Sequence, residues 1–188
     1  MRKVVVFVAV SLDGFLADAE GKVDWIRGEE EGTSDGGIYS SFIRSVDTVI
    51  MGYRTYHQIV CELSPEMWVY AGMRSYVVTH REIPSTREIA FTHQDPCDLV
   101  RMLKQQPGND IWVCGGADLV RQLMDGGCVD RLHLSVIPVV LGSGIRLFSS
   151  MSTPLELKLI RQASVNGIVE LVYERRQTEK DNIQPYNV

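Results

Sequence analysis

Residues 3–10, with the sequence KVVVFVAV, constrain the fold more than any other segment. Every position after Lys3 is apolar, and valine occurs at both odd and even positions. Because successive side chains of a strand point to opposite faces, both faces of this strand are hydrophobic. The segment therefore predicts a central strand of a sheet that is covered on both faces.

Strand-like and helix-like segments alternate along much of the remaining chain. Further strands are expected over residues 47–52, 75–80, 88–92, 111–116 and 130–142. Helices are expected over residues 38–46, 53–60, 95–106 and 117–127, and a long loop over 11–25. Near the C-terminus, Asn166-Gly167 separates two strand-like segments, which is the signature of a β-hairpin. This order predicts an α/β fold with a mostly parallel sheet, helices on both faces and an antiparallel C-terminal edge.

The 188 residues suit one domain with a sizeable core, and no linker or repeat divides them. We expect a single domain over residues 1–176 and a polar tail over 177–188. The net charge of −5, with lysines and arginines dispersed, argues against a nucleic-acid or membrane partner. The four cysteines and four histidines show no metal-binding spacing, and no apolar run reaches about 18 residues. We therefore expect a cytoplasmic protein that binds no metal.

The joint between the strand at 111–116 and the following helix contains Gly115-Gly116. A helix N-terminus presents unpaired N–H groups, and glycines let a phosphate approach the backbone closely. The same pair also makes a tight strand–helix turn, and the motif alone leaves both interpretations open. Asp118 in the first turn favours the helix dipole but repels a phosphate if it points inward.

Two other strand ends carry groups that suit a phosphate. Gly52 ends one expected strand, and Arg54 and Thr55 begin the helix that follows. Residues 79–81, with the sequence Thr-His-Arg, lie just past another strand end. Ligands of open α/β sheets bind at the carboxyl ends of strands, so three such joints suggest a ligand with several phosphates, such as a dinucleotide. Each joint alone is also compatible with a solvated arginine or a capping threonine.

Several motifs together resemble the dihydrofolate reductase-like superfamily. They resemble most closely the C-terminal reductase domain of the bifunctional riboflavin-biosynthesis deaminase-reductase. The resemblance covers residues 1–175 in order, and its most specific elements are SLDG at 11–14, MGYRTY at 51–56, Gly115-Gly116 and PVVLGSGIRLF at 138–148. It implies a three-layer α/β/α fold with a mainly parallel eight-stranded sheet, and an NADPH-dependent reductase.

The resemblance also implies roles for particular residues. The helix start at Gly52 would contact the cofactor phosphates, the strand end at Thr79 would lie near the 2′-phosphate, and Gly115-Gly116 would take the pyrophosphate. NADPH is expected rather than NADH because Arg54 and Arg81 can pair with a 2′-phosphate. The expected cofactor-binding residues are Gly52, Arg54, Thr55, Thr79, His80, Arg81, Gly115, Gly116, Ala117, Asp118 and Leu119.

The substrate is less well constrained than the cofactor. The riboflavin-pathway reductases tend to carry a lysine, an arginine and a glutamate where this chain has Phe7, Phe15 and Cys114. The loss of these polar groups argues against a phosphoribosyl substrate. Candidate catalytic residues are Asp13 and Asp35; the alternatives are that Asp13 makes a turn and that Asp35 caps a helix. The expected substrate-binding residues are Phe15, Trp25 and Arg146.

Three functions remain open from the sequence. One is reduction of a C=N or C=O group on a pterin-like or pyrimidine-like substrate, with the loop over 11–25 acting as a lid. The second is the riboflavin-pathway reduction of 5-amino-6-(5-phosphoribosylamino)uracil. The third is a catalytically silent NADPH-binding sensor or scaffold. The exposed C-terminal edge and family habit also predict a homodimer.

Overall fold

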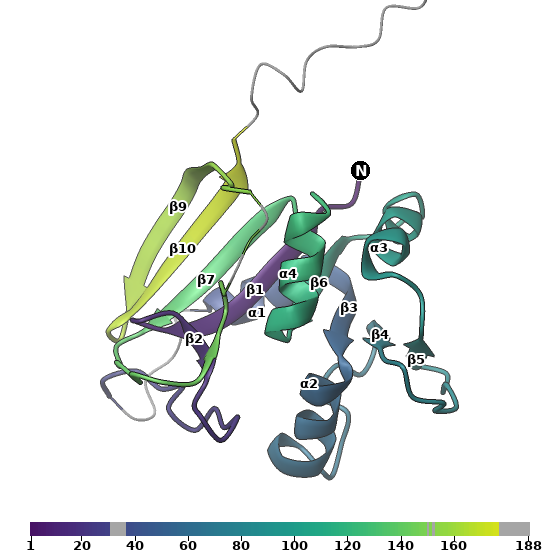
Figure 1. Ribbon diagram of the computed structural model, residues 1–188, viewed down its shortest axis with the longest axis horizontal. Coiled ribbons are helices and arrows are strands. Elements are labelled where there is room, and N and C mark those ends of the chain that lie inside the picture. The colour runs from purple at the N-terminus through teal and green to yellow at the C-terminus, as the bar shows by residue number, and fades with distance from the viewer. Residues whose placement is uncertain (31–36, 150, 152, 177–188) are drawn as a thin grey trace, which may run out of the picture.

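The structure is a computed structural model, and it describes residues 1–30, 37–149, 151 and 153–176. An eight-stranded sheet runs through the molecule in the order β5-β4-β3-β6-β1-β7-β10-β9 (Figure 1). Neighbouring strands pair in parallel from β5 to β7, and β10 pairs antiparallel with both β7 and β9. The strands are β1 (Val4–Ser11), β3 (Val46–Gly52), β4 (Arg74–Val78), β5 (Ile89–Thr92), β6 (Asp110–Gly115), β7 (Arg131–Ile137), β9 (Leu157–Val165) and β10 (Ile168–Arg175).

Helices cover both faces of this sheet, which confirms the expected three-layer α/β/α fold. In Figure 1, α4 lies in front of the sheet and α1 behind it. Helices α3 and α4 bury their apolar residues in one core, and α1 and η1 bury theirs in the other. The helices are α1 (Ile38–Ile43), α2 (Tyr53–Gln58), the π-helix η1 (Ile59–Leu63), α3 (Pro96–Lys104) and α4 (Ala117–Asp125).

Strand β1 supplies both cores. Its even-numbered valines, such as Val4 and Val6, pack with α3 and α4, while Val5 and Phe7 pack on the opposite face. Each of these side chains is at most 8% exposed. Full burial of one valine or phenylalanine stabilises a fold by about 1.5–3 kcal/mol, so this strand anchors the two layers to each other. The prediction of a central strand covered on both faces is confirmed.

Local polar groups determine where several elements end. Helix α1 is shorter than expected because the backbone N–H and hydroxyl of Ser45 both donate to the carbonyl of Phe42, and β3 starts one residue later. Strand β7 ends at Ile137, directly before Pro138, which has no N–H to continue a ladder. Helix α3 begins as expected, with the Asp95 carboxylate accepting from the N–H groups of Cys97 and Asp98.

The loop after β1 contains a short strand that the sequence did not reveal. Strand β2 (Phe15–Ala17) pairs antiparallel with β8 (Ile145–Arg146), a partner almost 130 residues away in the chain. The N–H of Leu12 donates to the carbonyl of Val139, and the N–H of Leu147 donates to that of Gly14. These pairings fasten the start of the loop to the segment after β7.

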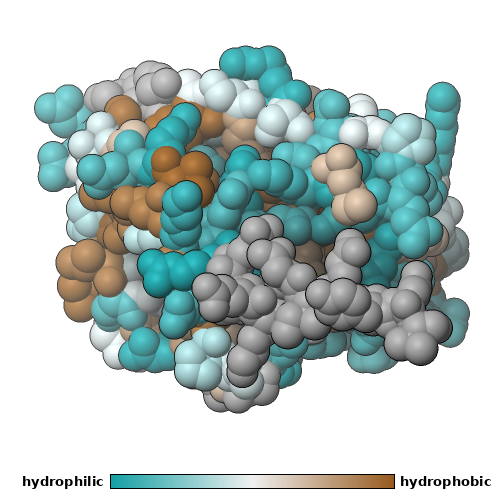
Figure 2. Space-filling view, turned by 90° about the horizontal axis from the view of Figure 1, so that it is seen from above, coloured by the Kyte–Doolittle hydropathy of each residue, from teal (hydrophilic) through white to brown (hydrophobic). Residues whose placement is uncertain are grey.

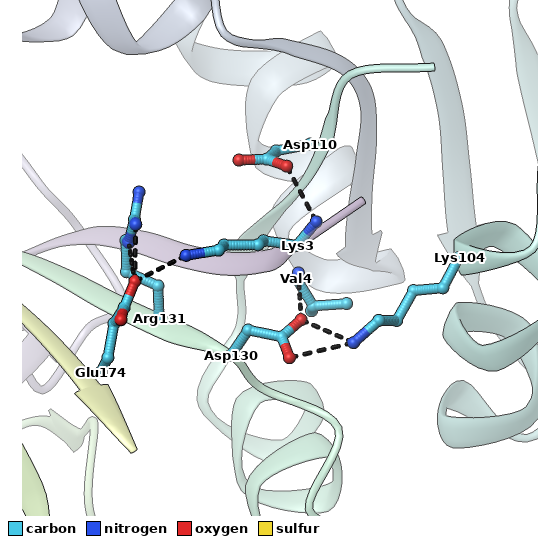
Figure 3. Close-up of polar contacts among 7 residues, drawn as sticks. All are labelled: Lys3, Val4, Lys104, Asp110, Asp130, Arg131 and Glu174. Atoms are coloured by element: carbon cyan, nitrogen blue, oxygen red, sulfur yellow. Dashed lines mark hydrogen bonds and ion pairs between the residues drawn. The ribbon is translucent and has the colours of Figure 1, made fainter. Parts of the chain in front are cut away.

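The amino ends of the parallel strands carry a network of paired charges (Figure 3). The Glu174 carboxylate accepts from Lys3 Nζ at 2.7 Å and from Arg131 at 2.6 Å. Asp130 accepts from Lys104 Nζ at 2.7 Å and from the N–H of Val4 at 2.7 Å. These contacts join β1, β7, β10 and α3 at one end of the sheet.

The hairpin edge of the sheet is partly apolar on its surface. Leu159 and Ile160 of β9 and Val169 of β10 are 38–47% exposed, and hydrophobic surface appears in Figure 2 on the side where the hairpin lies. No helix among the described residues is long and apolar enough to cross a membrane.

Candidate functional site

A cavity of about 1310 Å³ opens where the parallel strands β3, β4 and β6 end. Its lining comes from these strand ends, from α2 and α4, from the loop after β1, and from residues of β1, β7, β8 and β10. The structure brings all eleven expected cofactor-binding residues to this one cavity. They are Gly52, Arg54, Thr55, Thr79, His80, Arg81, Gly115, Gly116, Ala117, Asp118 and Leu119.

The two glycine joints lie side by side because β3 and β6 are adjacent parallel strands, with Met51 opposite Gly115. A Cβ added to Gly115 or Gly116 would lie 3.7 or 3.5 Å from Thr55 Oγ1, so the hydroxyl borders both glycines. Gly115 has a φ of +131°, and a cis peptide joins it to Gly116. The left-handed φ explains why glycine is needed at the first position.

The third strand end approaches the same place. The Arg81 guanidinium lies over the ring of Tyr53, 4.4 Å from its centroid, and Tyr53 begins α2. Thr79 is buried, and its hydroxyl accepts from the N–H of Arg81 at 3.0 Å. This turn after β4 places Arg81 beside the start of α2, close to the first glycine joint.

The cavity carries positive charge that the protein leaves unpaired. Arg54, Arg81 and Arg146 all line it and are exposed, and none has a carboxylate partner among the described residues. Carboxylates line it too, among them the exposed Asp118 of α4. A site of this kind suits an anionic ligand that supplies the missing partners for the guanidinium groups.

The loop after β1 crosses the cavity and is held at both ends. Gln58 of α2 donates to the carbonyl of Gly21 at 2.9 Å. Farther along, Asn166 in the β9–β10 turn exchanges hydrogen bonds with Glu30 in both directions. Between these anchors, Val23 and Ile26 line the cavity, which gives this part of the wall an apolar surface.

Asp13 does not line the cavity; its carboxylate connects two loops that border it. Its carboxylate accepts from Ser11 Oγ at 2.7 Å and from the N–H groups of Gly142 and Leu141 at 2.7 and 3.1 Å. Burial acts to raise the pKa of Asp13, but these hydrogen bonds outweigh it and lower the pKa to about 2. The ionised carboxylate therefore ties the loop after β1 to the loop after β7.

The predicted substrate-binding residues are only partly at the cavity. Arg146 lines it, and its guanidinium lies over the buried ring of Phe15 at 4.4 Å. Phe15 and Trp25 do not line it; the indole of Trp25 donates to the carbonyl of Lys22 at 3.2 Å. Asp35, the other candidate catalytic residue, lies outside the described residues.

The family model of the RibD C-terminal domain matches residues 2–169. The chain belongs to the RibD C-terminal domain family. It is 38% identical over 175 residues to the uncharacterized protein YwjB of Bacillus subtilis (strain 168), covering 93% of this chain and 98% of YwjB.

Solved structures show the same fold. A putative riboflavin biosynthesis protein from Shewanella sp. PV-4 superposes with a TM-score of 0.81 at 22% identity, over 94% of this chain and 100% of that one. Dihydrofolate reductase from Enterococcus faecalis, complexed with NADP(H) and RAB-propyl, gives a TM-score of 0.64 at 13% identity, over 93% and 97%. The chain thus has the dihydrofolate reductase-like fold that its motifs predicted.

Two of the three positions where the chain differs from the expected family pattern, Phe7 and Cys114, line the cavity and belong to an apolar floor. Phe7 packs against Phe42 and Trp112, and Phe7 and Trp112 both line the cavity. Cys114 Sγ lies 3.4 Å from the Tyr70 hydroxyl, and burial raises the pKa of the Cys114 thiol to about 11 although the hydrogen bond with Tyr70 lowers it. At neutral pH the thiol is uncharged, so this position contributes no charge to the cavity.

Sequence reasoning missed the polar end of this floor. Ser135 of β7 and Glu170 of β10 line the cavity, and Glu170 pairs with His133. The available signal was Glu170 itself, an acidic residue in an otherwise apolar strand segment, IVELVY. Its importance depends on which face of β10 is buried, which only the sheet order determines.

Proposed function

We propose that this protein is an NADPH-dependent reductase acting on a small flat heterocycle. The convergence of the three strand-end joints on one cavity, with unpaired arginines beside them, carries the proposal. Gly115 and Gly116 have no Cβ, so a pyrophosphate can approach their backbone beside the hydroxyl of Thr55. Arg54 and Arg81 are the groups that suit a 2′-phosphate, which distinguishes NADPH from NADH.

When bound, NADPH supplies the hydride, which would pass from its nicotinamide to a C=N or C=O group. The chain's own residues then have to align the substrate and exclude water. Phe7, Tyr39 and Trp112 offer aromatic surface for a planar ring, and Val23 and Ile26 cover the cavity from the loop after β1. The reaction also needs a proton. Because the pKa of Asp13 is about 2, we assign Asp13 to holding the loops, and Asp35 or a water molecule to proton delivery.

The cofactor assignment is tested by thermal unfolding with NADPH, with NADH and without ligand. A specific ligand at 100 times its dissociation constant stabilises the folded state by about 2.7 kcal/mol. We expect a clear rise in melting temperature with NADPH and a smaller one with NADH at equal concentration. Equal shifts would remove the 2′-phosphate role of Arg54 and Arg81, and no shift with either would refute the cofactor site.

Turnover separates the three functions that the sequence left open. NADPH oxidation, followed by loss of reduced-nicotinamide absorbance, is measured with dihydropterins, with the ribosylaminopyrimidine of riboflavin biosynthesis, and with simple carbonyl compounds. We expect oxidation with an unphosphorylated heterocycle, since Phe7, Phe15 and Cys114 replace polar family residues. Activity only on the phosphorylated pyrimidine would assign the riboflavin-pathway reaction, and NADPH binding without any turnover would favour a silent sensor.

We further propose that the protein is a cytoplasmic homodimer. Strand β9 forms the edge of the sheet and exposes Leu159 and Ile160, and unpaired strand edges with apolar side chains favour self-association. Sedimentation of a species larger than the 21.1 kDa chain is expected. A single 21.1 kDa species would reject the dimer.

A further inference from the structure

Two of the four cysteines lie together where helices α3 and α4 meet, at the opposite end of α4 from Gly116. Cys97 is in the first turn of α3, and Cys128 follows the last residue of α4 by three positions. Both pack in the core between these helices and the sheet, where Cys128 is 7% exposed and Cys97 is half-buried. Neither is in a disulfide, so the pair consists of two neighbouring thiols outside the cavity.

Both sulfur atoms contact the turn that ends α4. Cys97 Sγ is 3.6 Å from the carbonyl oxygen of Gln122, which also accepts from the N–H of Gly126 at 3.0 Å. Cys128 Sγ is 3.4 Å from the carbonyl oxygen of Gly126. A Cβ on Gly126 would overlap Cys97 Sγ, although the φ of −78° at this position suits other residues as well. The missing side chain at Gly126 therefore leaves room for the Cys97 sulfur beside Cys128.

The two thiols also interact with each other and with one basic side chain. Burial raises the pKa of Cys97 to about 12, and the hydrogen bond with Cys128 and its charge act in the same direction. Arg101 lies one turn farther along α3, and the charge of Cys128 is the largest cause that raises the pKa of its guanidinium. Because Cys97 keeps its proton and Arg101 faces Cys128, the first thiolate of the pair forms on Cys128.

A bond between Cys97 and Cys128 would enclose a large part of the fold in a covalent ring. The ring would contain nearly all of α3, the whole of β6 and α4, and the joint at Gly115-Gly116 between them. Such a cross-link stabilises a protein mainly because it restricts the unfolded chain. The nine residues of α4 span roughly 14 Å, so the bond would form well away from Gly116 and the cavity would stay open.

We propose that Cys97 and Cys128 are a redox-sensitive pair, which hydrogen peroxide converts to a disulfide that clamps α3 to the end of α4. The Cys128 thiolate attacks one peroxide oxygen, and the O–O bond breaks to give a sulfenic acid and, after protonation, one water. The Cys97 sulfur then attacks the Cys128 sulfur, the S–O bond breaks, and a second water leaves. The two thiols lose two electrons and two protons, and the peroxide accepts both. This inference is independent of the proposed reductase function.

The test uses the variant Cys61→Ser, which removes the exposed cysteine that would react with the oxidant by itself. The reduced protein is treated with a small excess of hydrogen peroxide and then unfolded, and its thiols are counted before and after reduction with dithiothreitol. We expect the three remaining thiols to fall to one and to return to three after reduction. Retention of all three thiols, or a loss that dithiothreitol does not reverse, would overturn the proposal.

Peptide mapping and matched variants identify the two cysteines that are linked. Proteolysis of the oxidised Cys61→Ser protein should release one disulfide-linked pair of peptides, which carry Cys97 and Cys128. Cys97→Ser in the same background should abolish the reversible loss of two thiols, and so should Cys128→Ser. A linked peptide that contains Cys114 would contradict the proposal. If the double variants do not fold, the peptide map of the Cys61→Ser protein decides by itself.

Urea denaturation tests whether the disulfide clamps the two helices. The oxidised Cys61→Ser protein should have an equilibrium constant of unfolding at least about ten-fold smaller than the reduced protein, as is usual for a cross-link that closes a long loop. The control is Cys61→Ser with Cys97→Ser, which should unfold at the same urea concentration before and after peroxide treatment. Equal unfolding midpoints for the two redox states of the Cys61→Ser protein would refute the clamp.

Discussion

The two ends of the parallel strands differ in whether their charged side chains are paired. At the amino ends, Lys3 and Arg131 share Glu174, and the buried Arg2 pairs with Asp47 and donates to the hydroxyl of Thr48. At the carboxyl ends, the arginines lining the cavity have no carboxylate partner among the described residues. Paired charges contribute to the fold, whereas unpaired charges beside a cavity are available to a ligand.

The largest effect on stability is expected at the amino end. Arg2→Ala removes a guanidinium that is 7% exposed and bonds Asp47, Thr48 and the carbonyl of Asn109. Losing the hydrogen bonds of this buried charged group should lower the free energy of unfolding by about 3 kcal/mol, while Asp47, which is 39% exposed, keeps the N–H of Asn109 as a partner. Urea denaturation measures this loss. Arg101→Ala, at an exposed pair with Asp98, serves as control and should leave the urea midpoint nearly unchanged.

A smaller loss is expected at the second glycine joint. Gly115→Ala places a side chain at a φ of +131°, a conformation that costs a non-glycine residue about 1–3 kcal/mol. NADPH binding should weaken as well, because relief of the strained φ would move the peptide groups proposed to contact the pyrophosphate. Calorimetric titration and urea denaturation measure the two effects. Wild-type NADPH affinity in this variant would argue that Gly115-Gly116 is only a tight turn.

Arg54→Ala tests the carboxyl ends of the strands, where we expect a change in cofactor affinity and almost none in stability. Because this exposed arginine has no described protein partner, the free energy of unfolding should change by no more than about 0.5 kcal/mol. Its NADPH affinity should fall by about ten-fold or more, while NADH affinity should stay nearly constant. Fluorescence titration with both cofactors checks this. A similar fall for both cofactors would place Arg54 away from the 2′-phosphate.

The smallest effect is expected on stability at acidic pH, through the carboxylate of Asp13. Asp13 has a pKa of about 2, below the usual 3.8, so its contribution to stability is present above about pH 4 and is lost as the pH falls toward 2. Asp13→Asn should therefore show a weaker decline in stability over this range than the wild type. Melting temperatures between pH 5 and 2 measure it. Parallel declines in both proteins would show that Asp13 does not hold the loops through its charge.

Much of the fold was readable because it depends on local patterns. The apolar segment at 3–10 required a strand covered on both faces, and Asn166-Gly167 required a hairpin. Strand β2 was not readable, since its partner β8 is distant in sequence and only two residues long. The end of α1 was also missed, because the capping contacts of Ser45 leave no periodic signal.

The sequence by itself determined the layered α/β/α fold and the residue types at three strand ends, because hydrophobic periodicity and glycine placement act locally. Only the tertiary structure decided that these three ends meet, since that follows from β3 lying between β4 and β6. It also decided that Asp13 bonds the loop after β7 and that Glu170 faces the cavity. Both depend on strand order and register, which join residues as far apart in sequence as Ser135 and Glu170 and which no short segment encodes.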